Sequence, residues 1–235
     1  MLRTAFRFIR YDKAKSLGVT IGIVISTFLI GQQVGIFTFL TSLMSGLTDH
    51  TESDVWIVDR KAINANALGT LDTRVIAEAR SIPGVRQAEP MVIAPAMATF
   101  ADGTTATVEV IGSEAPTFGA GPLPKDIIEG KLENLLEEAA VSGDFYDKFL
   151  FGGSSSVGTE FEINGRRAVF GVQTKNARGF AGAFMFSTAE RARYYAGLPA
   201  NTINAVLIYL EPGTDPPTVR DRINATIPNC RAWLR

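Results

Sequence analysis

An uncharged segment near the N-terminus constrains this chain more than any other feature. The sequence "SLGVTIGIVISTFLIGQQVGIFTFLTSLMSGL" occupies Ser16–Leu47, and no charged residue lies between Ser16 and Thr48. A helix needs about 20 apolar residues to cross a bilayer, and the core helix of a soluble protein rarely stays uncharged for so long. A cleaved signal peptide has an apolar core of about 7–15 residues and an Ala-x-Ala-like site, which this segment does not offer. We therefore predict a transmembrane helix and stalk over residues 16–47.

The flank before this helix predicts its orientation. Its charged residues are Arg3, Arg7, Arg10, Asp12, Lys13 and Lys15. Because short basic flanks stay in the cytoplasm, we expect a single-pass protein of the inner (plasma) membrane. Residues 1–15 are then cytoplasmic, and residues 48–235 form a periplasmic or otherwise extracytoplasmic domain. Arg3, Arg7 and Arg10 recur at helical spacing, which indicates either an amphipathic cytoplasmic interface or an ordinary basic flank.

Two Gly-x-x-x-Gly pairs lie within the predicted span. They are Gly18 with Gly22 and Gly31 with Gly35. This spacing lets two membrane helices approach closely, although glycine is common in membrane helices and each match alone carries little weight. At about 100° per residue the pairs lie on nearly opposite faces, so a helix that uses both has two neighbours.

Charge and cysteine content exclude some classes of function. Residues 1–15 carry a net charge of +4 and the whole chain carries −1, which leaves −5 for residues 16–235. This acidic balance argues against a nucleic-acid partner, which needs a basic face. Cys230 is the only cysteine, so no intramolecular disulfide can form and the exterior domain depends on packing alone.

The sequence contains no recognisable catalytic constellation. His50, the only histidine, is close in sequence to Asp49, Glu52 and Asp54, a set typical of metal ligands or, more simply, of the outer end of a membrane helix. The segment "GGSSSVGTE" has the glycine spacing of a phosphate loop, but Thr159 stands where lysine is needed. We therefore predict no enzyme activity and no catalytic, cofactor or metal site.

Hydrophobic periodicity in residues 48–235 predicts an α+β domain of two lobes. Helices are expected at 71–85, 187–198 and 214–228, and strands at 54–59, 88–100, 104–112, 159–174 and 201–213. Asp102-Gly103 and Asn164-Gly165 are strong hairpin turns. Residues 113–130 form an ordered loop, whereas 133–152 is either a helix or a short strand followed by a helix from about Asp144.

Three helix caps and a small aromatic cluster follow from local patterns. Asp72 and Asp215 are the expected N-caps of the first and third helices, and Ser187 forms a capping box with Glu190. Phe180, Phe184 and Phe186 are expected in the core. Around the second hairpin, basic side chains form either a patch for an acidic partner or ordinary solvated charges: Arg166, Arg167, Lys175 and Arg178.

The order of several motifs resembles a known family. A basic "LRTAFRFIRYDKAKS", one long span and "SDVWIVD" are followed by "ARSIPGVRQAEP", "INGRRAVFGV" and "RGFAGAFMFS". This arrangement covers nearly the whole chain and resembles the MacB/FtsX-type ABC transporter permeases, most of all their DevC-like branch. The resemblance implies a MacB-like periplasmic core after the first membrane helix.

The same resemblance implies a function and partners. It suggests a permease subunit of an ABC-type export or mechanotransmission complex, which dimerises, pairs with a cytoplasmic ATPase and engages a periplasmic adaptor. In that picture the N-terminal arginines lie near the ATPase and the glycine pairs pack in the dimer. Family members have three further membrane helices, so the chain is expected to be an N-terminal fragment, a split permease or a free-standing anchored domain.

Two other readings remain open from the sequence. One is a single-span, membrane-anchored periplasmic binding or assembly module without transport activity. The other is a pilin-like subunit, which also joins an apolar helix to an α+β head. Pilins need an acidic residue early in the apolar segment, and Ser16–Leu47 has none.

Overall fold

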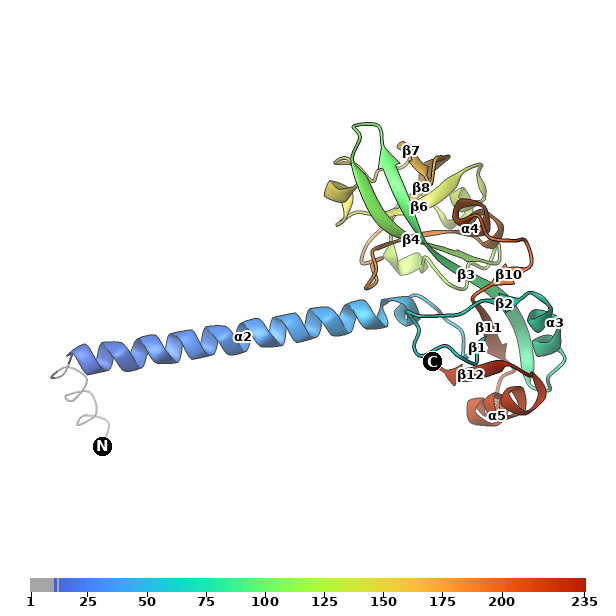
Figure 1. The fold of residues 1–235 in the computed structure, drawn as a ribbon, viewed down its shortest axis with the longest axis horizontal. Helices are drawn as coiled ribbons and strands as arrows, with labels where there is room; N and C mark the ends of the chain where they lie inside the picture. Colours follow the sequence, from blue (N-terminus) through green and yellow to red (C-terminus); the bar gives the residue numbers. More distant parts are fainter. Residues whose placement is uncertain (1–10, 12) are drawn as a thin grey trace. The chain divides into compact units, whose positions relative to one another are not determined.

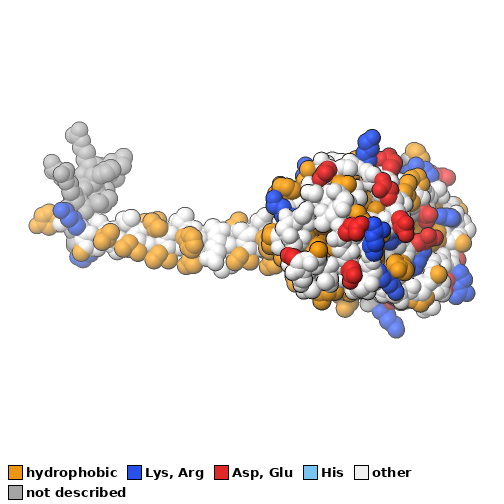
Figure 2. Space-filling view, turned by 90° about the horizontal axis from the view of Figure 1, so that it is seen from above, with side chains coloured by type: hydrophobic (Ala, Val, Ile, Leu, Met, Phe, Trp, Pro, Cys, Tyr) orange, Lys and Arg blue, Asp and Glu red, His pale blue; other side chains and the backbone are white. Residues whose placement is uncertain are grey.

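The computed structural model describes Tyr11 and residues 13–235. Its first described helix, α2 (Lys13–Asp49), has 37 residues and is long and apolar enough to cross a membrane. Figure 2 shows mostly hydrophobic and uncharged side chains along this helix beyond its basic end. The hydroxyls of Thr20, Thr38 and Thr41 donate to carbonyl oxygens one turn earlier, which satisfies these polar groups within an apolar segment. The predicted cytoplasmic arginines Arg3, Arg7 and Arg10 lie outside the described residues.

The chain divides into two compact units, one ending at Leu43 and the other comprising Met44–Arg235. We call the second the C-terminal unit; its α-helices are α3 (Arg74–Arg80), α4 (Ala189–Ala196) and α5 (Pro216–Thr226), and its short 3-10 helices are η1 (Pro124–Asp126), η2 (Leu132–Leu136) and η3 (Lys148–Leu150). Its strands are β1 (Val55–Asp59), β2 (Leu71–Asp72), β3 (Val85–Phe100), β4 (Thr105–Ser113), β5 (Ile127–Glu129), β6 (Ala140–Asp144), β7 (Glu160–Ile163), β8 (Arg166–Thr174), β9 (Ala183–Thr188), β10 (Thr202–Ile203), β11 (Ala205–Leu210) and β12 (Cys230–Leu234).

Ten of these strands form one sheet that is divided between two lobes (Figure 1). In the terminal lobe, β1 lies between β12 and β11, β11 pairs with the first half of β3, and α3 and α5 pack beside them. The second half of β3 continues into the barrel lobe, where it pairs with β4 and β7. The predicted two-lobed α+β fold is thus confirmed, with β3 as a strand shared by both lobes.

The barrel lobe closes through a seam of side-chain hydrogen bonds. Strands β3, β4 and β9 form one side, and β7, β8 and β6 form the other. β6 and β9 lie side by side, and Ser142 Oγ accepts a hydrogen bond from the Phe186 backbone at 2.9 Å. Ser187 Oγ and Arg191 Nη1 both donate to the Ala140 carbonyl oxygen, at 3.3 and 2.8 Å. These bonds replace a backbone ladder at the point of closure.

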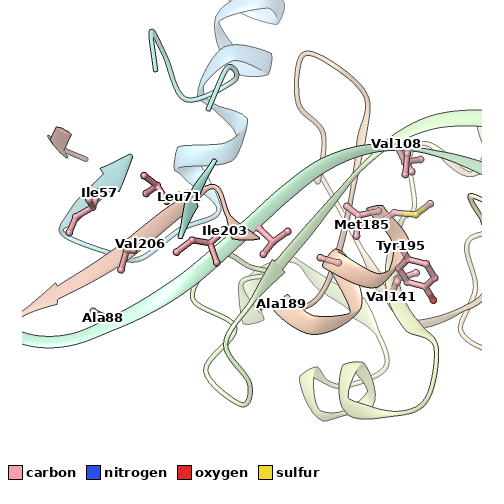
Figure 3. Packing of buried hydrophobic residues seen from close by; sticks show 14 of the residues in the cluster. Ile57, Leu71, Ala88, Val108, Val141, Met185, Ala189, Tyr195, Ile203 and Val206 are labelled. Atoms are coloured by element: carbon pink, nitrogen blue, oxygen red, sulfur yellow. The ribbon is translucent and has the colours of Figure 1, made fainter. Parts of the chain in front are cut away.

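The larger of two buried hydrophobic clusters passes through both lobes. Figure 3 shows it running from Ile57 and Val206 in the terminal lobe, past Ile203, to Met185 and Tyr195 in the barrel lobe. All five side chains are essentially inaccessible to solvent. Because protein interiors are close-packed, a continuous core of this kind transmits a displacement from one lobe to the other.

Most predicted elements occur where the sequence placed them. Asn164 (φ 50°) and Gly165 (φ 71°) both adopt the left-handed conformation that a two-residue hairpin turn requires. Asp215 caps α5, because its carboxylate accepts from the Thr218 backbone at 3.0 Å. Residues 113–130 form an ordered loop with the short strand β5 at its end.

Several local predictions were wrong. The cap of α4 is Thr188, the last residue of β9, whose hydroxyl accepts from the Arg191 backbone; the Ser187 hydroxyl instead donates to the Ala140 carbonyl oxygen. Asp72 belongs to β2 and accepts from the Arg74 backbone, while Thr73 holds the N-cap position of α3. No long helix follows Asp144; β6 ends there, and only η3 follows.

Candidate functional site

The last turn of α2 is buried within the C-terminal unit. Leu47 is completely buried and His50 is 6% exposed, whereas the apolar side chains of α2 before Leu43 are exposed. Gly46 is buried against the loop 175–182, and a Cβ there would lie 2.5 Å from the Arg178 carbonyl oxygen. Glycine is therefore required for this close approach. We call residues 44–50 and the side chains around them the junction.

Side chains from three segments cap the carbonyl groups at the end of α2. His50 Nδ1 lies 2.7 Å from the Gly46 oxygen, Asn66 Nδ2 donates to the Met44 oxygen at 3.2 Å, and Arg235 Nε donates to the Thr48 oxygen at 3.2 Å. The last carbonyls of a helix lack partners within the helix, and a cation there also interacts favourably with the helix dipole. The end of α2 is thus held by hydrogen bonds as well as by packing.

His50 is a packing residue of the junction. The centroid of its ring lies 5.9 Å from the centroid of the Phe184 ring, in an edge-on arrangement, and 5.5 Å from the centroid of the Phe186 ring. Its acidic neighbours in sequence do not gather around it: Asp49 accepts from Ser45 Oγ at 2.7 Å, and Asp54 accepts from the Leu210 backbone at 2.8 Å. Among Tyr11 and residues 13–235, no group of three or more His, Cys, Asp or Glu side chains forms a candidate metal site.

Two buried carboxylates join the loops around the junction. Asp144 accepts from the backbones of Ala177 and Tyr146, each at 2.8 Å. Asp147 forms an ion pair with Arg178 at 2.7 Å, and its side chain is 3% exposed. Burial raises the pKa of both carboxyls; backbone hydrogen bonds oppose this shift at Asp144, and Arg178 opposes it at Asp147. The loops 145–150 and 175–182 are therefore tied together beside the last turn of α2.

The glycine pairs of α2 stand free within the described chain. A Cβ at Gly18, Gly22, Gly31 or Gly35 would have nothing within 4 Å. The surface is therefore open at these positions, as helix–helix packing through small residues requires. The packing itself involves another helix and stays a prediction.

The four basic residues predicted around the second hairpin do not form one cluster. Arg166 and Arg167 begin β8, while Lys175 and Arg178 follow its end, and about 25 Å separates the two ends of a nine-residue strand. Arg167 pairs with Glu160 at 2.6 Å, and Arg166 stacks over the Tyr194 ring at 4.2 Å. The strand direction thus distributes these charges over two ends of the barrel lobe.

The predicted aromatic cluster is correct in part. Phe184 and Phe186 are completely buried, but Phe180 is 64% exposed. Phe184 and Phe186 belong to β9, which is buried on both faces, whereas Phe180 lies in the loop before it. The burial of the last turn of α2 was not predicted from the sequence. One feature indicated it: the uncharged segment is longer than a bilayer requires, so its end must lie outside the membrane.

A cavity of about 320 Å³ lies beside the loop 113–130 and is lined in part by Glu89, Phe118 and Tyr209. Glu89 Oε1 accepts from Gln87 Nε2 at 2.5 Å and from Thr117 Oγ1 at 2.7 Å, while Oε2 has no partner among the described residues. Burial raises the pKa of Glu89. Because Oε2 is itself inaccessible, the cavity offers no ready ligand group at this carboxyl.

Comparison with known proteins places this architecture in a family. A family model described as the MacB-like periplasmic core domain matches residues 16–226. The periplasmic region of MacB from Actinobacillus actinomycetemcomitans has a similar fold, with a TM-score of 0.58 and 9% identity over 82% of this chain and 93% of that one. The extracellular domain of the noncanonic ABC-type transporter YknZ, from Gram-positive bacteria, gives a TM-score of 0.54 and 12% identity over 77% and 98%. The comparison with curated proteins found no match. Since the family model covers most of its length, the chain belongs to the family of MacB-like periplasmic core domains.

Proposed function

We propose that this chain is a permease subunit, or the N-terminal part of one, in an ABC-type export or mechanotransmission complex of the DevC-like branch. Its family membership supports the class of complex. The single observation that carries the mechanism is the burial of Gly46, Leu47 and His50, at the end of a helix that is long and apolar enough to cross a membrane, within the C-terminal unit.

The junction supplies a rigid connection for transmitting movement. A shift or rotation of the last turn of α2 displaces Arg178 directly, because Gly46 contacts its backbone. Arg178 pulls on Asp147, and Phe184 links His50 to the barrel lobe. Leu47, Phe184 and Phe186 belong to a second buried cluster that also contains Trp56 and Val58 of β1 and Leu207 of β11. Close packing within this cluster then carries the movement to the terminal lobe. We therefore assign to the junction the role of coupling membrane movement to the C-terminal unit.

The proposal specifies partners and topology. A cytoplasmic ABC ATPase drives the complex and lies near Arg3, Arg7 and Arg10, and a periplasmic adaptor binds the C-terminal unit, with the basic ends of β8 as candidate contacts. Two copies of the chain pack through the glycine pairs of α2. The N-terminus is cytoplasmic, and the C-terminal unit is extracytoplasmic. The chain itself has no catalytic role.

Affinity purification in mild detergent tests the partners. The chain carries a C-terminal tag, is expressed at its native level, and is purified with its partners for mass spectrometry. Recovery of an ABC ATPase together with an adaptor supports the proposal. Recovery of an adaptor without any ATPase supports a membrane-anchored binding or assembly module, and recovery of neither contradicts the transport complex.

A reporter fusion tests the topology. Alkaline phosphatase fused after Arg235 is active only outside the cytoplasm, so the fusion is expected to be active. A green fluorescent protein fusion at the same position, which folds poorly after export in unfolded form, is the matched control and is expected to be dark. The reverse pattern would overturn the proposed orientation.

A further inference from the structure

Three loops that meet at the junction expose large apolar side chains. Ile63 is 85% exposed in the loop after β1, and Phe180 is 64% exposed in the loop 175–182. The loop 145–150 exposes Tyr146 by 60% and Phe149 by 67%. Most other large apolar residues of the C-terminal unit are buried or half-buried, so four such side chains on neighbouring loops are unusual for a surface that faces only water.

The hydrogen bonds and contacts of the junction locate these loops. The loop of Ile63 reaches the end of α2 through Asn66, which donates to the Met44 oxygen. The loop of Phe180 reaches it through Arg178, whose carbonyl contacts Gly46. The third loop is tied to Arg178 by Asp147, two residues before Phe149. All three loops therefore surround the point at which the chain leaves the C-terminal unit for the membrane helix.

Chain length sets the distance between this point and the membrane. The stretch from Lys15, the last basic residue of the flank, to Met44 is about 29 residues, or about 44 Å of helix at 1.5 Å per residue. A bilayer with its headgroups is about 40–45 Å thick, and an ordinary tilt shortens the span slightly. Met44 therefore lies at the outer boundary of the headgroups, and the loops that contact residues 44–46 meet the lipid surface.

Side-chain chemistry fits the same environment. Tyr146 suits the boundary between headgroups and acyl chains, where its apolar ring and polar hydroxyl are both accommodated. Phe149, Phe180 and Ile63 are purely apolar and suit the acyl side of the same boundary. Each loop also carries a lysine close to its apolar residue: Lys61, Lys148 and Lys175. Basic side chains next to apolar ones favour a surface of anionic lipid. Asp147 of the loop 145–150 and Asp144 just before it are buried and do not oppose this attraction. Asp49 of the junction is exposed and accepts a hydrogen bond from Ser45 Oγ, so the three lysines outnumber this carboxylate.

We propose that Ile63, Tyr146, Phe149 and Phe180, with the three lysines, form a collar that binds phospholipid headgroups of the leaflet nearest the C-terminal unit. The inference rests on the proposed membrane anchoring by α2. The apolar side chains enter the interface, and the lysines contact lipid phosphates. Contact at several points around α2 fixes the unit at one height above the membrane, so that movement of α2 is converted into motion within the unit.

Site-directed spin labelling of the full chain tests the collar. Cys230 is the only cysteine and is replaced in a Cys230→Ser background. Phe149→Cys and Phe180→Cys are labelled separately, and the protein is reconstituted in vesicles of phosphatidylcholine with one quarter phosphatidylglycerol. The matched control is Ala77→Cys, an exposed residue on α3, which lies on the side of the C-terminal unit away from residues 44–50 (Figure 1). Collisions of the label with oxygen, which concentrates in lipid, and with a water-soluble nickel chelate are then measured.

We expect the ratio of oxygen to nickel collisions at residues 149 and 180 to exceed that at residue 77 by at least about threefold. A ratio equal to that of residue 77, in protein that floats with the vesicles and resists carbonate extraction, overturns the collar while leaving the anchor intact. Failure to float overturns the anchor itself. Shielding from both reagents indicates a protein contact and also overturns lipid binding.

A second measurement tests the lysines. The triple variant K61Q/K148Q/K175Q removes three charges, two at exposed positions and one at the half-buried Lys175, and leaves the core unchanged. The collision ratios at residues 149 and 180 are expected to fall toward the control in vesicles that contain phosphatidylglycerol, and to change little in pure phosphatidylcholine. An equal effect in both lipids would show that the lysines do not act on anionic headgroups.

Discussion

Gly46 in the last turn of α2 faces the carbonyl oxygen of Arg178 so closely that a Cβ at residue 46 would lie 2.5 Å from that oxygen. Neither partner can move away easily, because Gly46 is part of a helix and the Arg178 side chain is bound to Asp147. The contact is therefore a fixed point between the last turn of α2 and the loops around it.

Gly46→Ala is expected to loosen the junction. The added methyl group overlaps a backbone oxygen, and overpacking of this kind costs about 1–3 kcal/mol. The melting temperature of the full chain in detergent, followed by near-ultraviolet circular dichroism, is expected to fall. Val19→Ile is the control, because it adds one methyl group to the same helix at a position that is 63% exposed and belongs to neither glycine pair, and the melting temperature is expected to stay the same. An equal melting temperature for Gly46→Ala and the wild type would contradict the contact.

Arg178→Met is expected to destabilise the C-terminal unit in a pH-dependent way. The change leaves the buried Asp147 carboxylate without its cation. Loss of one partner of a buried pair lowers the free energy of unfolding by up to about 3–5 kcal/mol. The lower value is expected here because the Arg178 side chain is 43% exposed. Burial already raises the pKa of Asp147, and Arg178 lowers it. Without Arg178 the pKa rises further, so the loss is large at pH 8 and shrinks as the pH falls and the carboxyl binds its proton.

A double variant supplies the control for this prediction. In Asp147→Asn/Arg178→Met the buried group is neutral at every pH, so the pH-dependent part of the loss is expected to disappear. Urea unfolding at pH 5 and pH 8 measures both effects. A loss in Arg178→Met that is the same at the two pH values would show that the ion pair does not determine the stability of these loops.

Glu109→Gln is expected to stabilise the protein at alkaline pH. Glu109 is 8% exposed, and burial raises its pKa above the ordinary value of 4.5. A raised carboxyl pKa means that the folded state binds the proton more tightly than the unfolded state. The stability that comes from this tighter proton binding is fully present below pH 4.5, and it is lost as the pH rises through the pKa that Glu109 has in the folded protein. The variant lacks this loss, so its advantage over the wild type grows from pH 4 to pH 8.

The comparison with Glu211→Gln isolates burial as the cause. Glu211 is exposed directly after β11. Its substitution is expected to change the free energy of unfolding, measured by urea, by less than about 0.5 kcal/mol at either pH. If Glu109→Gln and Glu211→Gln shift the midpoint alike, the buried carboxylate is not the source of the effect.

Gly22→Ile and Gly35→Ile are expected to weaken self-association of α2 in the membrane. Neither added side chain meets an atom within the described chain near its Cβ, so a loss of association reports contact with another helix. We expect at least a tenfold weaker dimer by energy transfer between labelled copies in vesicles, equivalent to about 1.4 kcal/mol. Ile30→Phe is the control for added volume on the same helix, because Ile30 is exposed and, at about 100° per residue, lies between the two glycine faces. Unchanged energy transfer in both glycine variants would exclude the glycine pairs as a dimer surface.

Local sequence patterns determined much of the fold because each depends on neighbouring residues. The uncharged segment defined α2, and the Asn164-Gly165 dipeptide defined the second hairpin because its turn requires positive φ at both residues. The cap of α5 at Asp215 followed from the same kind of local bonding. Predictions failed where two elements meet: Thr188 caps α4, because the Ser187 hydroxyl is engaged across the barrel seam and the Thr188 hydroxyl accepts from the Arg191 backbone.

The sequence by itself thus determined a membrane-sized helix, an α+β domain and its family resemblance, since hydrophobic periodicity, turn chemistry and motif order are all written along the chain. Only the tertiary structure decided that Gly46, Leu47 and His50 are buried among Phe184, Phe186 and Arg178, and that Phe180 is exposed. The burial of the last turn of α2 depends on contacts between residues more than 100 positions apart, and such contacts are set by strand register and packing, which a local pattern does not encode.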